Sequence, residues 1–289
     1  MDVKDWLVLK ILDEERNITK ASFRLYTSQP AVTYRLKKLE EELGAELLIR
    51  LPNGISFTPQ GEHLVEYAKE MLVRLEQTKD AIGNMKTAVQ GALRMGASGV
   101  FAHYALPELF KGFLDKFPAV ELSLKTGLSS QVVRMLEKQE IVLGIVRGEH
   151  EWREESLLLS EEPVCLVSRE PLSVDDLTRR SFIRYNTDVS LQRMVDDWWR
   201  KNFDHPPHTA MDVNTMDTAR QLVLHGLGWS ILPMIGLRKS DSLFTRELFW
   251  PDGKPLIRST RILYSRAALQ LKAVVAFIDY LRDWYKIKI

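Results

Sequence analysis

Apolar residues recur at helical spacing in two consecutive segments near the start of the chain. The first segment runs from residue 18 to about residue 25, behind Asn17, which is a good N-cap. Its inward-facing positions are Ile18, Ala21, Ser22 and Leu25. The second segment begins after the cap Ser28 and ends at Gly44. Its buried stripe steps by four, three and four residues through Val32, Leu36, Leu39 and Leu43.

The buried stripe of the second helix determines which of its side chains face outward. These are Gln29, Pro30, Thr33, Tyr34 and Lys37. Two strand-like runs, 47–51 and 55–58, follow and flank Pro52-Asn53-Gly54, where Asn-Gly is expected to supply the positive φ angles of a tight hairpin. Two helices followed by a hairpin predict a winged helix-turn-helix, whose second helix enters the major groove of DNA.

Positive charge gathers in this region, although the whole chain has a net charge of only +1. No acid lies between residues 16 and 38, and the basic residues there are Arg16, Lys20, Arg24, Arg35, Lys37 and Lys38. The acids at 40–42 follow at once and are expected to point away from phosphate. Two packed helices without DNA would be a simpler interpretation, but the wing, the caps and the polarised charge together favour DNA binding.

A long helix is predicted next, with Thr58 as its cap and Pro59 at its first position. Its apolar positions alternate steps of four and three residues through Leu64, Ala68, Met71, Leu75, Thr78, Ile82, Met85 and Val89. This period is typical of a coiled-coil seam, whereas a helix packed only on its own domain would show a wider apolar face. We therefore expect 59–90 to be a dimerising helix, because a two-fold pair of winged helices reads two half-sites.

Strand-like and helix-like runs alternate from Gln90-Gly91 to the end of the chain. The expected strands are ALRMGA, VELSLKT, IVLGIV, PVCLVS, SFIRY, WSILP and RILYS, and the expected helices include 104–117, 130–138, 191–202 and 217–225. This alternation predicts an α/β domain. Turns are expected at Pro206-Pro207 and at 251–253.

Composition places the chain among ordinary globular proteins. With 289 residues, 45% of them hydrophobic, the chain has room for two or three domains. No apolar run approaches the roughly 20 residues of a membrane span, and the first residues contain acids where a signal peptide needs basic and then apolar residues. We expect a cytoplasmic protein. The single Cys165 excludes an internal disulfide and is expected to be a core residue rather than a reactive thiol.

A glycine turn and two arginines are the candidates for a small-molecule site. Gly96 to Gly99 lie between a strand and a helix, so the amides from Ser98 to Phe101 are placed to attract an anion. Arg147 follows the strand IVLGIV, and Arg258 lies in PLIRSTR beside the late strand of an expected second lobe. Arginine binds carboxylates through two parallel hydrogen bonds. The alternative is an ordinary turn and two arginines in interdomain or surface salt bridges.

An enzyme is the rival class, and the residues do not favour it. The six histidines are scattered, and the one close pair, His205 and His208, has only Asp204 nearby. The chain contains no nucleophile elbow, P-loop or dinucleotide-binding fingerprint. We expect no catalytic residues, no metal and no cofactor. A third class, an architectural DNA-binding protein without a ligand, leaves some 200 C-terminal residues unexplained.

The stretch SQPAVTYRLKKLEEELG, followed by a wing and FTPQG, resembles the N-terminal DNA-binding domain of the LysR-type transcriptional regulators. The resemblance implies that Gln29, Pro30, Thr33 and Tyr34 approach bases and that Ser28, Lys37, Arg50 and Ser56 contact phosphates. The chain departs from the family pattern at Ser22, which replaces an alanine, at Phe23, where a polar residue is usual, and at Tyr34, where a basic or small polar residue is commoner. These departures affect the base preference and not the fold.

The same resemblance covers the whole chain and implies an α+β multidomain protein. Its parts are a winged helix-turn-helix (1–58), a coiled-coil linker helix (59–90), commonly within a dimer of dimers, and a two-lobed α/β effector-binding domain (91–289) of periplasmic-binding-protein type. The first lobe is expected near 91–163 plus 266–289 and the second near 164–265, with the ligand cleft between them.

The effector itself is suggested by two short motifs. GIVRG and PLIRST are similar to the branch of the family that responds to citrate and related carboxylates. This similarity implies a carboxylate effector held by Ser98, Gly99, Arg147 and Arg258. An uncharged or aromatic effector is the alternative. The expected partners are double-stranded DNA, further copies of the chain as a homotetramer, and the effector, with no membrane.

Overall fold

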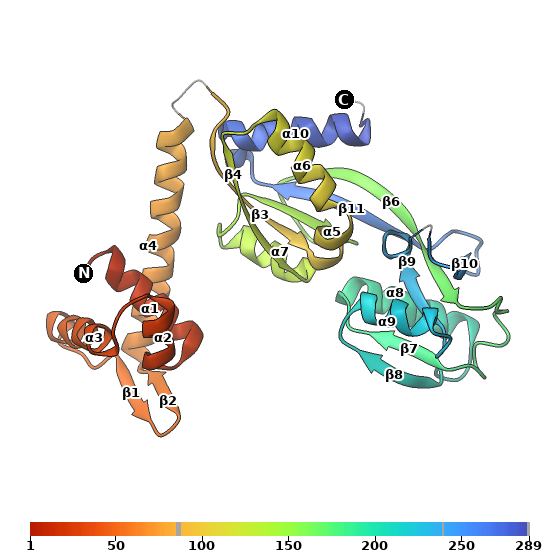
Figure 1. Cartoon of the computed structure of the whole chain (residues 1–289), viewed down its shortest axis with the longest axis horizontal. Helices are drawn as coiled ribbons and strands as arrows, with labels where there is room; N and C mark the ends of the chain where they lie inside the picture. Colours follow the sequence, from red (N-terminus) through yellow and green to blue (C-terminus); the bar gives the residue numbers. More distant parts are fainter. Residues whose placement is uncertain (85–87, 239, 288–289) are drawn as a thin grey trace. The chain divides into compact units, whose positions relative to one another are not determined.

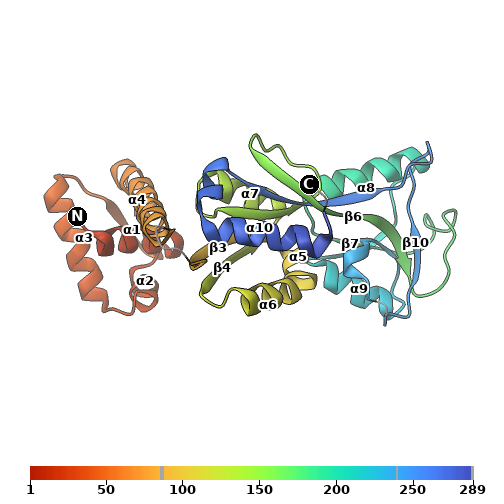
Figure 2. The ribbon, with the colours of Figure 1, turned by 90° about the horizontal axis from the view of Figure 1, so that it is seen from above.

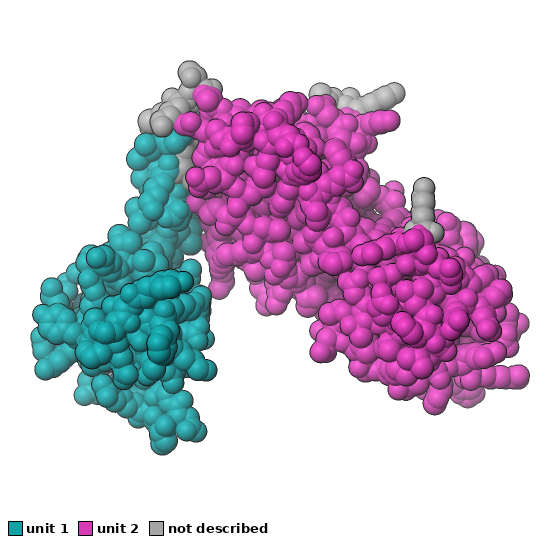
Figure 3. All heavy atoms as spheres, viewed as in Figure 1, with its two compact units in different colours: residues 1–83 teal, residues 84–289 magenta. Residues whose placement is uncertain are grey.

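The computed structural model describes residues 1–84, 88–238 and 240–287. The chain forms two compact units, Met1–Gly83 and Asn84–Ile289 (Figure 3). The long helix α4 (Pro59–Asn84) belongs to the first unit up to Gly83, so the expected linker helix and the expected winged helix-turn-helix form one compact unit. Within the described residues, no helix is both long and apolar enough to cross a membrane.

The N-terminal unit is a helical bundle with a β-hairpin (Figure 1). Its elements before α4 are α1 (Val3–Glu15), α2 (Ile18–Arg24), α3 (Gln29–Leu43), β1 (Leu48–Leu51) and β2 (Gly54–Phe57). Asn17 and Ser28 cap α2 and α3 by accepting hydrogen bonds from the amides of Lys20 and Ala31, which confirms the predicted helix starts. Helix α1 was not predicted from the sequence.

The apolar stripes of these helices meet in one core, as expected. Its buried residues are Val8, Leu9, Leu12, Ala21, Val32, Leu36, Leu39, Leu47, Ile55, Phe57, Val65 and Ala68. Leu43 was expected to continue the stripe of α3, and that expectation is wrong, because its side chain is 48% exposed. Leu43 is the last residue of α3, and the left-handed Gly44 turns the chain away directly after it.

The wing differs in detail from the prediction. Leu51 pairs with Gly54, so the two turn residues are Pro52 and Asn53. Gly54 has a φ of +146°, but Asn53 does not have a positive φ, so the expectation for Asn53 is wrong. The proline ring explains this, because it fixes a negative φ at the first turn position and excludes a turn with two positive φ angles. A Cβ on Gly54 would lie only 2.3 Å from the carbonyl oxygen of Arg16.

Helix α4 starts where the sequence predicted, since the amide of Gly61 donates to the Thr58 hydroxyl at 3.0 Å. Only some of the predicted seam residues are available to contact a second copy of the chain. Leu64 and Ala68 pack into the core of the N-terminal unit, Met85 lies outside the described residues, and Val89 was wrongly placed in the helix. Val89 lies beyond α4 and packs on the core of the C-terminal unit. The remaining seam positions are Met71, Leu75, Thr78 and Ile82.

The first lobe of the C-terminal unit is built on a sheet with strand order β6-β11-β5-β3-β4. The strands are β3 (Gly91–Ser98), β4 (Val120–Gly127), β5 (Leu143–Arg147), β6 (Glu155–Ser168) and β11 (Ile257–Tyr264). The helices are α5 (Gly99–Tyr104), α6 (Leu106–Lys116), α7 (Ser129–Glu137) and α10 (Lys272–Tyr285), with a short helix η2 (Arg266–Gln270). Helices α6 and α10 lie side by side, with the rings of Phe113 and Phe277 4.9 Å apart (Figures 1 and 2).

The second lobe begins where β6 crosses into it. The far half of β6 pairs with β10 (Phe244–Glu247) and β9 (Ser230–Pro233), and β7 (Phe182–Tyr185) pairs in parallel with β8 (Thr209–Val213). Helices α8 (Val189–Asn202) and α9 (Met216–Leu224) and the short η1 (Met234–Gly236) complete the lobe. Cys165 is buried in β6, where burial raises the pKa of its thiol to about 12, as suits a core residue.

Two expectations about this unit need correction, and some of its strands were not predicted. The second lobe was expected to reach residue 265, but 257–264 form β11, which pairs with β5 of the first lobe. This long-range antiparallel pairing leaves no local signature in the sequence. One helix was expected over 104–117, but α5 ends at Tyr104 and α6 restarts at Leu106, with Pro107 in its first turn. Strands β8 and β10 and the first half of β6 were not predicted.

Candidate functional site

The predicted DNA-reading side chains lie on the outer surface of α3 and its cap. Ser28, Gln29, Pro30, Tyr34 and Lys37 are exposed, with Tyr34 at 70%, and Thr33 is half-buried. The Thr19 hydroxyl of α2 donates to the side-chain oxygen of Gln29 at 3.2 Å, which orients the amide group of Gln29. The recognition face is therefore accessible.

The wing carries the two other predicted phosphate contacts. Arg50 of β1 is exposed and pairs with Ile55, whereas Ser56 of β2 is half-buried and pairs with Ile49. Side chains at successive register positions point to opposite faces of a hairpin, so Arg50 and Ser56 lie on opposite faces of this short ribbon. Their contacts with phosphate remain a prediction.

The basic residues of this region are less free than their number suggested. Acids of α1 neutralise three of them: Arg16 pairs with Asp13, Arg24 with Glu14 and Glu15, and Arg35 with Asp5. Lys37 lies 3.8 Å from Glu41. These acids lie outside residues 16–38 in the sequence, but the fold places them next to the basic residues of that stretch. The DNA-facing charge therefore depends more on lysines and on Arg50 than the sequence indicated.

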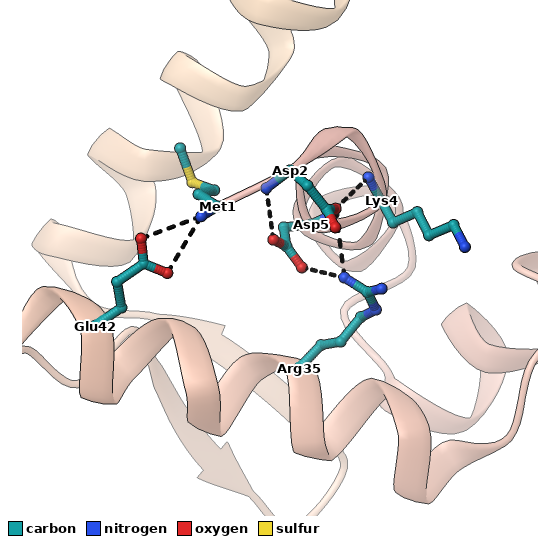
Figure 4. Close-up of polar contacts among 6 residues, drawn as sticks. All are labelled: Met1, Asp2, Lys4, Asp5, Arg35 and Glu42. Carbon is teal, nitrogen blue, oxygen red and sulfur yellow. Dashed lines mark hydrogen bonds and ion pairs between the residues drawn. The ribbon is translucent and has the colours of Figure 1, made fainter.

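A polar cluster ties α3 to the start of α1 (Figure 4). Asp2 and Asp5 cap α1 reciprocally, and Arg35 of α3 donates to Asp5 at 2.5 Å and to Asp2 at 3.4 Å. The amides of Asp5 and Lys4, together with Arg35, hold the pKa of the Asp2 carboxyl below its usual value. Glu42 accepts from the N-terminal ammonium at 3.1 Å. These contacts hold the recognition helix at a defined angle to α1.

The DNA face gives a first prediction. Gln29→Ala should relax base discrimination by roughly 1 to 3 kcal/mol, because glutamine can pair bidentately with an adenine edge. Lys37→Ala should instead weaken binding to all sequences alike and reduce the salt dependence by about one ion. Fluorescence anisotropy against a selected operator and its scrambled duplex at several salt concentrations measures both effects. An unchanged ratio of specific to non-specific affinity in Gln29→Ala would refute the assigned recognition-helix register.

In the C-terminal unit, a cavity of about 470 Å³ is lined by residues of both lobes. All four predicted effector contacts line it, namely Ser98, Gly99, Arg147 and Arg258. Further lining residues come from the second lobe, including Tyr185, Asp188 and Met216. The structure thus brings together, in one cavity, residues that are up to 160 positions apart in the sequence.

Four helices start at this cavity, and the sequence had indicated only the first. The lining residues Ser98, Leu128, Asp188 and Thr215 are the N-caps of α5, α7, α8 and α9. Ser98 accepts from the Phe101 amide at 3.3 Å, so that amide is not available to a ligand. A helix N-terminus carries a partial positive charge of about half an elementary charge, so the cavity favours an anion.

Both arginines are buried, each with 2% of its surface exposed, and each faces a carboxylate. Arg147 forms an ion pair with Glu162. Arg258 lies 3.5 Å from Asp188 and donates to the Ser190 hydroxyl at 3.3 Å and to the Arg147 carbonyl at 3.1 Å. Burial and the neighbouring Arg258 lower the pKa of Arg147 to about 9. Each arginine thus forms an ion pair that is enclosed in the unit rather than on its surface, and both arginines also line the cavity.

Asp188 and Tyr185 were not identified from the sequence. Asp188 stands at the start of α8 and accepts from the Ser129 hydroxyl at 2.9 Å, which links the second lobe to α7 of the first. An acidic residue directly before a helix is a typical N-cap and could have identified Asp188. The predicted helix began at Leu191, two residues too late, so Asp188 was not recognised as its cap. Asp217 of α9, which lines the cavity, accepts a hydrogen bond from Tyr104 of α5, and burial and this carboxylate raise the pKa of Tyr104 to about 12.

Both units match known family models. Residues 3–62 match the bacterial regulatory helix-turn-helix proteins of the lysR family, and residues 86–286 match the LysR substrate binding domain. The chain belongs to the LysR family. It is a DNA-binding transcriptional regulator with an effector-binding domain, as its recognition helix and two-lobed unit had indicated. Among the residues that the structure describes, no cluster of three His, Cys, Asp or Glu is arranged to hold a metal.

Relatives cover the full length of this LysR-family regulator. The chain is 45% identical to the HTH-type transcriptional regulator YraN and 30% identical to YkuM, both of Bacillus subtilis (strain 168), over 98% of its length and 98% and 97% of theirs. The LysR family regulator CbnR has the same fold, with a TM-score of 0.70 at 21% identity, over 98% of this chain and 99% of that one. Its complex with target DNA matches with a TM-score of 0.69 at 20% identity over the same shares.

Proposed function

We propose that this LysR-family regulator responds to a small carboxylate of the citrate class, bound in the cavity between its lobes. The observation that supports this proposal is the meeting of four helix N-termini with Arg147 and Arg258 at one cavity of about 470 Å³. Small-molecule sites typically measure about 300–1,000 Å³. The cavity therefore has the size and the local charge for such a ligand.

The charges of the cavity decide which groups hold the ligand. Arg147 and Arg258 are balanced by Glu162 and Asp188, and Asp217 adds a further carboxylate to the lining, so the helix ends have to supply the net attraction for an anion. We expect one carboxylate to bind the amides beside Ser98 and to reach Arg258. Apolar lining residues cover other parts of the wall, namely Val100, Leu128, Leu191, Met216 and Pro233. They favour the second candidate, an aromatic or uncharged effector.

Effector binding would act on DNA by shifting a population of conformations. A ligand that contacts both lobes favours one arrangement of the lobes over the other, by as much as its affinities for the two differ. In a homo-oligomer paired through α4, for which we propose a dimer of dimers, such a shift changes the spacing or tilt of the DNA-binding units. The bend of the promoter would change with it.

The proposal is tested on its two arginines. Arg258→Ala should weaken carboxylate binding by about 2 to 4 kcal/mol, because a charge-assisted contact is lost and the desolvated carboxylate is left without a partner. Arg147→Ala should have the smaller effect, since Glu162 already occupies that guanidinium. Calorimetric titration of citrate, isocitrate, malate and an aromatic acid into the full-length proteins measures this.

DNA binding without effector provides the control, because neither arginine lies in the DNA-binding unit. Both variants should bind DNA as the parent chain does. Tight binding of an aromatic or uncharged ligand that is indifferent to both substitutions would favour the second candidate. If no metabolite binds or raises the melting temperature, the cavity has no effector of the kinds tested, and the carboxylate proposal fails.

A further inference from the structure

We propose that Asp188 is a built-in competitor of the effector: its carboxylate occupies Arg258 in the empty protein, and the effector carboxylate displaces it. This inference rests on the proposed carboxylate effector. It makes Asp188 a residue that sets the affinity and selectivity of the cavity, and it couples ligand binding to the contact between the lobes.

The position of Asp188 supports this role. It lines the cavity at the start of α8 in the second lobe and is 6% exposed. One oxygen, Oδ2, accepts from the Ser129 hydroxyl of the first lobe at 2.9 Å and lies 3.5 Å from Nη2 of Arg258. A carboxylate of the protein thus already occupies the arginine that the ligand needs.

The contact between Asp188 and Arg258 is poor for a buried ion pair. A charge-assisted hydrogen bond usually measures about 2.7–2.9 Å, and arginine commonly binds a carboxylate through two of them. Here a single separation of 3.5 Å joins the groups, and neither Oδ1 of Asp188 nor Nε of Arg258 has a hydrogen-bond partner.

A closer contact between an arginine and a carboxylate lies elsewhere in the C-terminal unit. Nη1 of the buried Arg220 donates to both oxygens of Asp241, at 2.9 and 2.8 Å, although Nε of Arg220 has no hydrogen-bond partner either. The hydrogen bond from Ser129 fixes Oδ2 of Asp188, so the carboxylate does not present both of its oxygens to Arg258. A free carboxylate has no such tether, so it can make the two-point contact that Asp188 does not.

Displacement has a structural consequence, because Asp188 is also the partner of Ser129. The same oxygen of Asp188 accepts from Ser129 and faces Arg258. When a ligand binds Arg258 in place of Asp188, the ion pair is broken and only the hydrogen bond to Ser129 still joins Asp188 to the first lobe. The competition also selects among ligands. A monocarboxylate offers no more charge than Asp188, whereas a di- or tricarboxylate can in addition reach the starts of α7 and α9, whose caps line the same cavity.

Chemical rescue tests the competition without any effector. Asp188→Ala leaves a space beside Arg258 for a small anion, so formate should raise its melting temperature more than that of the parent chain. Asp188→Asn is the matched control, since it removes the same charge but leaves no space. If Asp188→Ala does not fold, Asp188→Ser provides a similar space. Equal responses to formate in the alanine or serine variant and in Asp188→Asn would overturn the inference.

Citrate titration tests the same idea with the proposed effector class. Asp188→Asn should bind citrate about tenfold more tightly than the parent chain, because no internal carboxylate competes for Arg258. Asp241→Asn is the control, since it removes a buried partner of an arginine that does not line the cavity, and its citrate affinity should stay within about twofold.

The outcomes separate this inference from the proposed function. If citrate binds the parent chain and Asp188→Asn binds it more weakly, a carboxylate effector is supported but Asp188 is a ligand contact, and the inference is overturned. If citrate binds none of the proteins, the proposed effector class fails for citrate, and the formate result decides the role of Asp188 by itself.

Discussion

The double variant Leu75→Asp, Ile82→Asp should form a smaller oligomer than the parent protein. Leu75 is half-buried and Ile82 is 60% exposed in the single chain, and both lie on the α4 seam, outside the buried clusters of the described residues. If a second copy covers this seam, each new carboxylate is buried without a partner. The cost is on the order of several kcal/mol per charge, which is enough to separate subunits.

The matched control carries the same charge on the opposite face of the helix. Val73 and Gln77 are each two residues from Leu75, which places them about 200° around α4. The double variant Val73→Asp, Gln77→Asp should therefore keep the parent mass. Sedimentation velocity at several protein concentrations compares the three proteins. An unchanged mass for Leu75→Asp, Ile82→Asp would mean that the subunits associate through another surface.

Features that are local in the sequence were predicted well. The caps Asn17 and Ser28, the stripe of α3 and the start of α4 at Thr58 depend on residues within one or two helical turns. A resemblance to known proteins extended this to the two-lobed unit, and the four predicted effector contacts do line one cavity. Periodicity and capping are therefore sufficient for α2, α3 and the start of α4, but they missed α1 and placed Asn53 of the wing in the wrong conformation.

Features that depend on distant residues were missed, and each has a physical reason. The charge of α3 depends on acids of α1, such as Asp5, which reach Arg35 only in the fold. The lobe boundary depends on β11 pairing with β5, and the state of Arg258 depends on Asp188, 70 positions away. The apolar residues around an arginine in the sequence can indicate that its side chain is buried. They do not indicate which distant carboxylate pairs with it.

Gly61→Ala should destabilise the N-terminal unit strongly, although it removes no DNA contact. A Cβ at this position would lie 2.1 Å from the carbonyl oxygen of Leu47 and 2.9 Å from the ring of Phe57. The Leu47 carbonyl cannot retreat, because it also accepts from the Thr58 amide at 3.0 Å. The first turn of α4 must therefore lift from the wing, and we expect a loss of roughly 3 kcal/mol in the free energy of unfolding.

Gly83 provides a control with the opposite sign on the same helix. Nothing lies within 4 Å of a Cβ placed there, so Gly83→Ala should stabilise α4 by up to about 1 kcal/mol through its higher helix propensity. Thermal unfolding followed by circular dichroism, together with anisotropy on any duplex DNA, compares the two variants in the full chain. Gly61→Ala should lose affinity as its N-terminal unit unfolds, while Gly83→Ala keeps it. Equal melting temperatures would show that α4 does not pack against Leu47 as closely as the structure describes, because only that contact distinguishes the two substitutions.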